Sequence, residues 1–211
     1  MDSFSVNKWD SLITTSKSTM DSGVEETDDK VMKMYVEKTN KVIARVSEIG
    51  LPKKNEQLRL VTKRSFNSVA FIKHICENET IEDAVFVVYS INFEAAKIIN
   101  DLIESGKIKK ATILISNLRN KAHRKKEQLT KDLFIDNPNI RLIFASSHAK
   151  IIATKTKSNH YVIEGSGNLS YNSRIEQYTI DNSEQVYRFT KEWIDEICEY
   201  LKGKKELIIY D

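Results

Sequence analysis

Proline, glycine and cysteine are all scarce in this sequence. Its 211 residues include 2 prolines, 6 glycines and 2 cysteines. So little proline and glycine excludes a collagen-like or linker-rich chain. The two cysteines, Cys76 and Cys198, fall in apolar segments with helical spacing, which indicates reduced thiols in a protein core. Cys and His residues with the spacing of a zinc site are lacking, so we expect no metal and no cofactor.

Long apolar runs are lacking as well. The first residues, "MDSFSVNKWDSLITTSKS", do not contain the apolar core of a signal peptide, and no stretch is long enough to span a bilayer. We therefore expect a cytoplasmic protein with no stable membrane association. The excess of positive charge is small, at +3 near neutral pH. A net charge of this size does not by itself predict binding to nucleic acid.

The sequence does contain enough apolar residues to build a sizeable core. Hydrophobic residues make up 40% of it and charged residues 30%, which is typical of a soluble globular domain. Residues 1–24, rich in Ser, Thr and Asp, are expected to form a flexible N-terminal arm. Helical spacing of apolar residues predicts an N-terminal helix over 25–50, ended by Gly50 and Pro52. Residues 55–211 are then expected to form one α/β domain.

Strand-like and helical segments alternate in the first part of this domain. The strand-like segments are 56–63, 83–91, 109–116 and 139–146, and the helical ones are 68–78, 93–106 and about 121–135. The apolar runs of the strands are nearly continuous, which is typical of strands buried on both faces. The pattern predicts a mostly parallel or mixed central sheet with helices on both faces.

After Ser147 this alternation ends. The segments "HAKIIATK" and "HYVIEGSG", joined by "TKSN", predict a β-hairpin. "EQYTID" is expected to add a further strand and "ELIIY" an edge strand. Between them, residues 183–203 predict an amphipathic helix. The apolar stripe expected to face the core consists of Val186, Phe189, Trp193, Ile194, Ile197 and Leu201.

Polar side chains come in two pairs around the predicted hairpin. Residues two apart in a strand point to the same face, so His148 and Lys150 project together. Ser166 and Asn168 do the same if the backbone there stays extended. The hairpin brings the pairs side by side, and Glu176 can return to them from the next strand. Lys, Asn and Ser donate hydrogen bonds to an oxyanion such as phosphate, and an imidazole beside it suits nucleophilic or acid–base catalysis.

The His-x-Lys segment followed by "GSGNLSYNSRIEQ" resembles the signature of the phospholipase D superfamily. The resemblance is strongest over about 140–180 and implies a phospholipase D-like α/β fold and a metal-independent reaction. By position, it implies that His148 forms a phosphohistidine, Lys150 and Asn168 hold the phosphoryl oxygens, Ser166 assists, and Glu176 orients an imidazole. Gly165 and Gly167 are expected to let the backbone approach the anion closely.

Two features set this chain apart from many members of that superfamily. The family often has an Asp five residues after the motif lysine, where this chain has Lys155, although some nuclease members also lack that Asp. The chain also carries one motif, whereas members of the superfamily use two facing each other. The resemblance therefore implies a homodimer with a shared site, like the small Nuc-type endonucleases, and a bell-shaped pH dependence.

A basic segment, 117–131, follows the third predicted strand. Ligands of open α/β sheets gather where strands end, so this segment is a candidate for contacts with a phosphate backbone. It is equally well interpreted as a solvated, charged helix face. The candidate substrate-binding residues are Arg119, Lys121, Arg124 and Lys125 in this segment, and Arg174 after the motif.

The sequence thus favours a metal-independent phosphodiesterase, a nuclease acting on DNA in a site shared by a homodimer. Two other functions use the same fold. One is a phospholipase or phosphatidyltransferase that acts through the same residues. The other is a catalytically inactive phospholipase D-like module for nucleic-acid binding or assembly.

Overall fold

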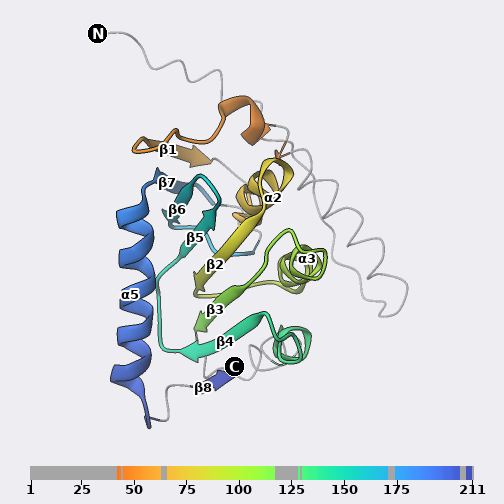
Figure 1. The fold of residues 1–211 in the computed structure, drawn as a ribbon, viewed down its shortest axis with the longest axis vertical. Coiled ribbons are helices and arrows are strands. Elements are labelled where there is room, and N and C mark those ends of the chain that lie inside the picture. The colour runs from red at the N-terminus through yellow and green to blue at the C-terminus, as the bar shows by residue number, and fades with distance from the viewer. Residues whose placement is uncertain are drawn as a thin grey trace.

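The computed structural model describes residues 42–43, 45–62, 66–116, 128, 130–170, 174–204 and 208–210. Within them, eight strands form one sheet with helices on both faces (Figure 1). The strands are β1 (Gln57–Thr62), β2 (Ile81–Val88), β3 (Ala111–Ser116), β4 (Ile140–Ala145), β5 (Ile151–Thr156), β6 (His160–Gly165), β7 (Glu176–Asn182) and β8 (Ile208–Tyr210). The helices are α2 (Val69–Asn78), α3 (Phe93–Glu104) and α5 (Glu184–Leu201).

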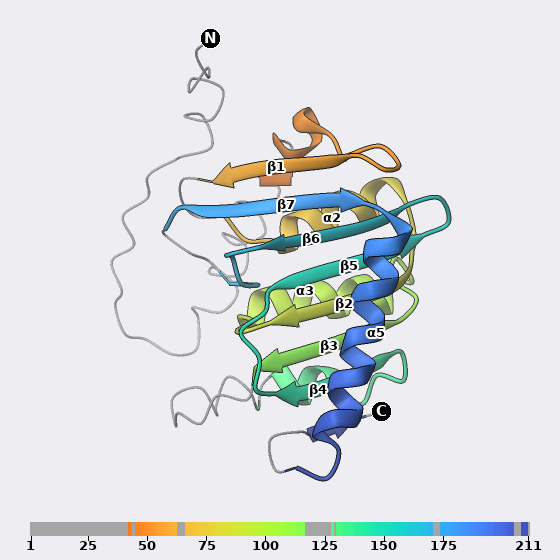
Figure 2. The ribbon, with the colours of Figure 1, turned by 90° about the vertical axis from the view of Figure 1, so that its left-hand side faces the viewer.

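The sheet is mixed, with the strand order β1-β7-β6-β5-β2-β3-β4-β8. Strands β2, β3 and β4 are parallel to one another, and their arrowheads lie on the same side in Figure 2. All other neighbouring strands pair antiparallel. The predicted α/β fold class is confirmed, but its parallel part is limited to β2–β4. The reason is that β5 and β6 follow each other through a short turn, which joins only antiparallel neighbours.

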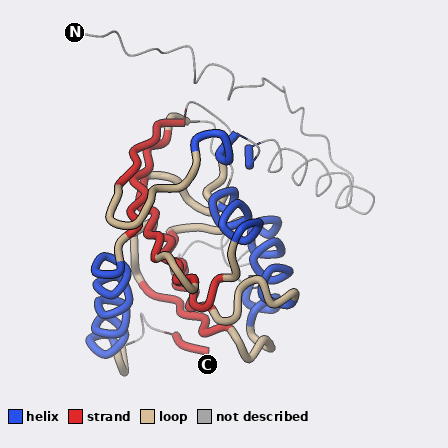
Figure 3. Tube along the Cα trace, turned by 45° about the horizontal axis from the view of Figure 1, so that its top comes forward, coloured by secondary structure: helices blue, strands red, loops and turns tan. Residues whose placement is uncertain are grey.

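The central strands are buried on both faces, as their continuous apolar runs predict. In β2, Phe86 and Val88 pack in the core under α2 and α3, whereas Val85 and Val87 pack in the smaller core under α5. Figure 3 shows α5 on one side of the sheet and the other helices on the opposite side. The predicted end of α3 is also confirmed, because Gly106 adopts a positive φ of 72° just after it.

The buried face of α5 differs from the stripe predicted from the sequence. Phe189 and Ile197, which we expected in the core, are exposed, and Val186, Trp193 and Leu201 are only partly buried. The residues of α5 that are buried are Tyr187, Thr190, Ile194 and Cys198. Compared with the prediction, the helix is rotated about its axis. The prediction was wrong because it chose core residues by hydrophobicity alone and therefore left out Tyr187 and Thr190.

Polar contacts from β2 account for this rotation. The hydroxyl of Tyr187 donates to Asp83 Oδ2 at 2.6 Å, and the ammonium of Lys191 lies 2.5 Å from the same oxygen. Asp83 is buried in the sheet, and a buried carboxylate is costly unless it is hydrogen-bonded and paired. The helix therefore turns Tyr187 and Lys191, and not Phe189, toward the sheet.

Several sequence predictions fall on the N-terminal part of the chain. Residues 42–43 and 45–49 are helical, and Gly50, with a φ of 79°, donates its N–H to the carbonyl of Val46. The described helical residues therefore end at Ile49, directly before Gly50. The rest of the predicted N-terminal helix, the arm over 1–24 and residues 121–127 of the predicted polar helix lie outside the described residues.

Both cysteines are buried, as their apolar surroundings predict. Burial raises the pKa of the Cys76 thiol to about 12, so it stays protonated near neutral pH. Among the helices that the structure describes, none combines the length and the apolar character that a membrane crossing requires.

His160 should make stability depend on pH. Burial lowers the pKa of His160 below its usual value near 6.5, while Glu184 partly opposes this shift; the His160 ring lies 5.3 Å from the Tyr187 ring between centroids. The unfolded chain then binds more protons than the folded one below about pH 6.5, so acidification should destabilise the fold. His160→Gln should reduce the loss in the free energy of unfolding between about pH 7.5 and about pH 5. An unchanged pH dependence in that variant, followed by chemical denaturation, would contradict this assignment.

Candidate active site

The residues of the candidate site meet at one edge of the sheet, the one where the strands β2 and β6 end and β5 and β7 begin. Val87, near the end of β2, pairs with Ile151 at the start of β5, and Ile151 pairs in turn with Glu164 near the end of β6. Farther along, Thr62 at the end of β1 pairs with Glu176 at the start of β7. This is also the edge where the parallel strands β2, β3 and β4 end, the usual place for ligands in α/β sheets.

His148 and Lys150 lie just before β5 and not within a strand, which corrects the predicted strand boundary. The paired residues of β5 begin with Ile151, which lies opposite Val87 on one side and Glu164 on the other. The two side chains still lie together, as predicted. Lys150 Nζ is 3.4 Å from His148 Nδ1 and donates to the His148 carbonyl oxygen at 2.8 Å.

The ammonium of Lys150 is partly desolvated. This burial lowers the pKa of Lys150, and the carboxylate of Glu176 opposes the shift. A partly desolvated ammonium beside an exposed imidazole is well placed to bind an anion that approaches from solvent.

Ser166 and Glu176 are paired with each other. The hydroxyl of Ser166 donates to the carboxylate of Glu176, and its oxygen accepts the N–H of Gln177 at 3.1 Å. Glu176 is only 4% exposed, so this contact fixes a buried carboxylate at the site. The pair joins the end of β6 to the start of β7. The roles predicted for both residues in catalysis stay predictions.

Asn168 is held from both sides by the segments that precede α2 and α3. Its side-chain Oδ1 accepts the N–H of Ser90 at 3.2 Å, and its backbone carbonyl accepts the hydroxyl of Ser68 at 3.2 Å. Because the amide oxygen is engaged, the NH₂ end of Asn168 is the end that can donate to a ligand. The backbone of Ser90 therefore holds the side chain of Asn168 in place.

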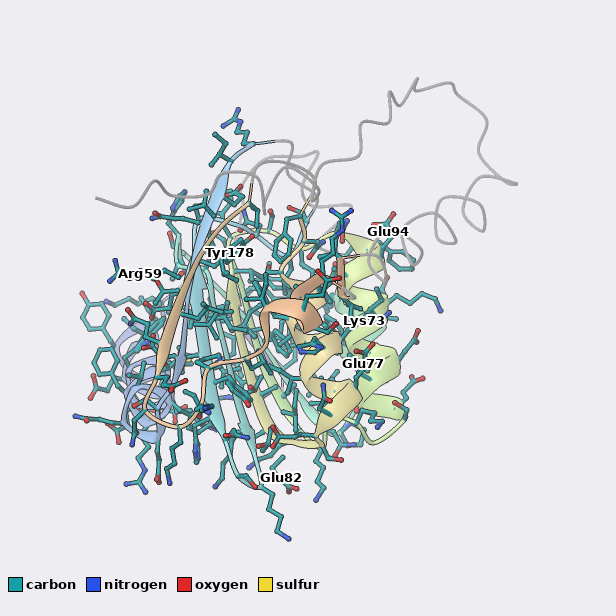
Figure 4. All side chains as sticks on the ribbon, turned by 90° about the horizontal axis from the view of Figure 1, so that it is seen from above. Arg59, Lys73, Glu77, Glu82, Glu94 and Tyr178 are labelled. Atoms are coloured by element: carbon teal, nitrogen blue, oxygen red, sulfur yellow. The ribbon has the colours of Figure 1, made fainter. Side chains whose placement is uncertain are left out.

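The glycines of the motif make room for β7. A Cβ on Gly165 would lie 2.2 Å from the backbone oxygen of Gln177, and a Cβ on Gly167 would lie 1.8 Å from the Tyr178 hydroxyl. Tyr178, labelled in Figure 4, is buried against Phe66 and cannot easily yield. The space beside both glycines is thus filled by the protein itself, a reason for glycine other than the anion contact that we expected.

Gly165→Ala should therefore destabilise the protein. The clash is with backbone, so the β6–β7 pairing must shift, and overpacking of this kind typically costs about 1–3 kcal/mol. The free energy of unfolding from chemical denaturation measures the effect. Glu164→Ala is the matched control, because Glu164 is exposed on the same strand. Equal stability of the two variants would contradict the steric argument.

The remaining predicted residues are placed as follows. Arg119, Lys121, Arg124 and Lys125 lie outside the described residues. Arg174 is exposed and lies two residues before Glu176, at the same edge. Lys155, which stands where the family often has Asp, lies five residues along β5 from Lys150, roughly 17 Å in an extended strand. The departure at Lys155 therefore removes no group from the immediate surroundings of His148.

Solved structures provide the comparison for this arrangement, since no protein-family model and no curated protein sequence matches the chain. The polyphosphate kinase of Porphyromonas gingivalis aligns with 68% of this chain and 24% of its own, at 10% identity and a TM-score of 0.50. The phosphatidylserine synthase of Haemophilus influenzae aligns with 72% of this chain and 39% of its own, at 10% identity and a TM-score of 0.48. TrmBL2, an archaeal chromatin protein, aligns with 83% of this chain and 64% of its own, at 11% identity and a TM-score of 0.45.

The match to polyphosphate kinase concerns the fold. The fold is of the phospholipase D type. This chain spans less than two thirds of the length of each of the three proteins. In the phospholipase D-type fold of this chain, His148, Lys150, Ser166, Asn168 and Glu176 lie at the edge where β2 and β6 end.

Tyr89, at the same edge, was missed by the sequence analysis. Its ring lies 4.9 Å from the imidazole of His148 between centroids, and Lys150 Nζ lies 5.5 Å from its centre. The signal that could have found it is its position directly after β2, at the end of a buried parallel strand. Within the described ranges, no group of three or more His, Cys, Asp or Glu side chains could hold a metal ion.

Proposed function

We propose that this protein is a metal-independent phosphodiesterase, a nuclease that cleaves DNA through a phosphohistidine in a site shared by a homodimer. The observation that carries the proposal is the gathering of His148, Lys150 and Asn168 at one edge of the sheet, with Ser166 and Glu176 beside them. An exposed imidazole next to an ammonium and an amide NH₂ matches what transfer of a phosphoryl group requires.

The anion-binding part of the site is supplied by Lys150 and Asn168. The ammonium brings positive charge, and the NH₂ of Asn168 donates a hydrogen bond, so both favour the extra negative charge that develops on phosphorus-bound oxygens. Ser166 is already engaged with Glu176 and Gln177, and this favours a role in holding the carboxylate. Glu176 in turn lies close enough to Lys150 to stabilise its charged form.

The nucleophile in this proposal is the imidazole of His148. Attack by Nε2 requires the proton to reside on Nδ1, and Nδ1 is the nitrogen that Lys150 Nζ approaches at 3.4 Å. The ammonium must therefore turn from the imidazole to the phosphoryl oxygens when substrate binds. In the first step an N–P bond forms and the P–O bond to the leaving group breaks. In the second, water attacks phosphorus and the N–P bond breaks.

A second imidazole is needed to protonate the leaving oxygen and then to deprotonate the attacking water. The chain carries one His-x-Lys motif, so this group is His148 of the partner subunit, and a twofold axis passes through the site. Ile175, directly before Glu176 at the same edge, is 70% exposed. In the proposed dimer, this side chain would be covered by the second copy.

DNA is the substrate favoured by the basic residues in the sequence after β3 and by Arg174. Arg174 is exposed at the same edge, and the sequence that follows β3 carries Arg119, Lys121, Arg124 and Lys125. Lysine and arginine side chains provide the sequence-independent part of DNA binding by neutralising phosphates. Binding should therefore weaken steeply as the salt concentration rises.

The test incubates the wild-type protein with labelled DNA, a small aromatic phosphodiester and anionic phospholipid vesicles, all in excess EDTA. We expect cleavage of DNA and of the small diester that persists in EDTA. Loss of activity on chelation would contradict the metal-independent mechanism. Hydrolysis of the vesicles alone would replace DNA by lipid as the substrate, and salt-dependent DNA binding without turnover would favour the inactive module.

The shared site has a test of its own. Refolding wild-type chains with an excess of His148→Ala chains should reduce the activity per wild-type chain, because mixed dimers contain one competent imidazole in a site that needs two. Sedimentation should show the wild-type protein as a dimer. A monomeric wild-type protein that turns over substrate would contradict the proposal.

A further inference from the structure

We infer that Tyr89 is a positioning residue of this site, whose ring sets the orientation of the His148 imidazole and also contacts the Lys150 ammonium. The inference rests on the proposed function, because it concerns the reaction in which His148 attacks phosphorus. It adds a residue that lies outside the motif of His148, Lys150, Ser166, Asn168 and Glu176.

The geometry around Tyr89 provides two contacts from one ring. The planes of Tyr89 and His148 are tilted by 51° with their centroids 4.9 Å apart, within the range of favourable aromatic pairs. Lys150 Nζ lies 5.5 Å from the Tyr89 centroid, within reach of a cation–π interaction. The same ring therefore touches both members of the His-x-Lys pair.

These contacts matter because the His148 imidazole lies at the surface. His148 is exposed and lies outside regular secondary structure, so its backbone is not fixed by a sheet ladder. A nucleophile must be held close to its attack geometry, since a misplacement of about 1 Å can cost about a hundredfold in rate. A neighbouring ring at this distance and tilt restricts the rotation of the imidazole.

The segment that carries Tyr89 is itself fixed to the other half of the motif. Ser90 N–H donates to Asn168 Oδ1, Asn92 N–H donates to the carbonyl of Leu169 at 2.9 Å, and Ile91 forms a parallel bridge with Leu169. Residues 89–92 thus connect the His-x-Lys pair to Asn168. Their position after β2 lets one short segment set the distance between nucleophile and anion-binding amide.

The experiment compares Tyr89→Phe, which keeps the ring, with Tyr89→Leu, which removes it at similar volume. The proton signals of the His148 ring, identified by their loss in His148→Gln, should carry a ring-current shift in the wild type and in Tyr89→Phe and lose it in Tyr89→Leu. In steady-state hydrolysis of a small phosphodiester, Tyr89→Leu should lower kcat by roughly tenfold to a hundredfold with little change in KM. Tyr89→Phe should stay within about twofold of wild type.

The outcomes separate this inference from the proposed function. A His148 signal that is unchanged in Tyr89→Leu would overturn the inference, and so would a lost ring-current shift with unchanged kcat. A wild-type protein with the shift but no hydrolysis would overturn the proposed function instead. Thermal unfolding establishes that each variant is folded, and Tyr89→Met repeats the test if the leucine variant is not.

Discussion

Replacing His148 by alanine should abolish phosphodiester hydrolysis and leave the fold intact. The side chain is exposed at the end of the sheet, so its loss removes no core packing. In the proposed mechanism it removes both the nucleophile and, through the partner subunit, the proton donor. We expect kcat to fall by at least about a thousandfold, as for other enzymes that lose a nucleophile or an acid–base group.

The measurement is a rate assay with labelled DNA in EDTA, supported by trapping of the intermediate. With a substrate labelled at phosphorus, the wild-type protein quenched in alkali should retain label as phosphohistidine, and the variant should not. His160→Ala is the matched control, because it removes the imidazole of β6, whose ring packs against Tyr187. Equal rates for wild type and His148→Ala would remove His148 from the chemistry.

Much of the fold follows from local sequence patterns. The apolar runs over 83–88, 111–116 and 140–145 become the parallel strands β2, β3 and β4, because such runs are stable only when both faces are covered. The hairpin of β5 and β6 follows from two apolar runs joined by a polar turn. Gly50 and Gly106 adopt the positive φ expected of residues that end helices.

Other features depend on contacts that a single sequence does not reveal. The rotation of α5 is set by Asp83, which lies more than a hundred residues earlier in the chain and receives Tyr187 and Lys191. The start of β5 is set by its pairing, which begins with Ile151 opposite Val87 and Glu164. Both are consequences of tertiary pairing, which overrides the local pattern of hydrophobicity.

The candidate site also combines features that follow from local sequence with features that depend on long-range contacts. Spacing alone brings His148 and Lys150 together, and the hairpin brings Ser166 and Asn168 toward them. The contacts that fix these groups are long-range: Ser90 with Asn168 across 78 residues, and Tyr89 with His148 across 59 residues. Residue types and spacing therefore indicate which groups take part, whereas the pairing of strands decides which of them touch.

Asn168→Asp should strongly lower kcat/KM, because it weakens anion binding at the site, and should leave the structure of the site unchanged. An aspartate has nearly the same shape, and its oxygen can still accept the N–H of Ser90. It loses the NH₂ donor, however, and places a negative charge where a phosphate must bind. Removal of one oxyanion donor typically costs about 10²–10³ in rate, and the added repulsion should bring kcat/KM at least to that level.

The control for this change is Asn55→Asp, which alters the net charge equally at the opposite edge of the sheet. Asn55 is exposed with a φ of 65°, a conformation that Asp tolerates as well as Asn does. We expect near wild-type kcat/KM for Asn55→Asp and unchanged thermal unfolding for both variants. If both lost activity equally, the effect would be one of overall charge. If Asn168→Asp kept full activity, the amide would not be a phosphoryl ligand, and the anion would have to bind through Lys150 without it.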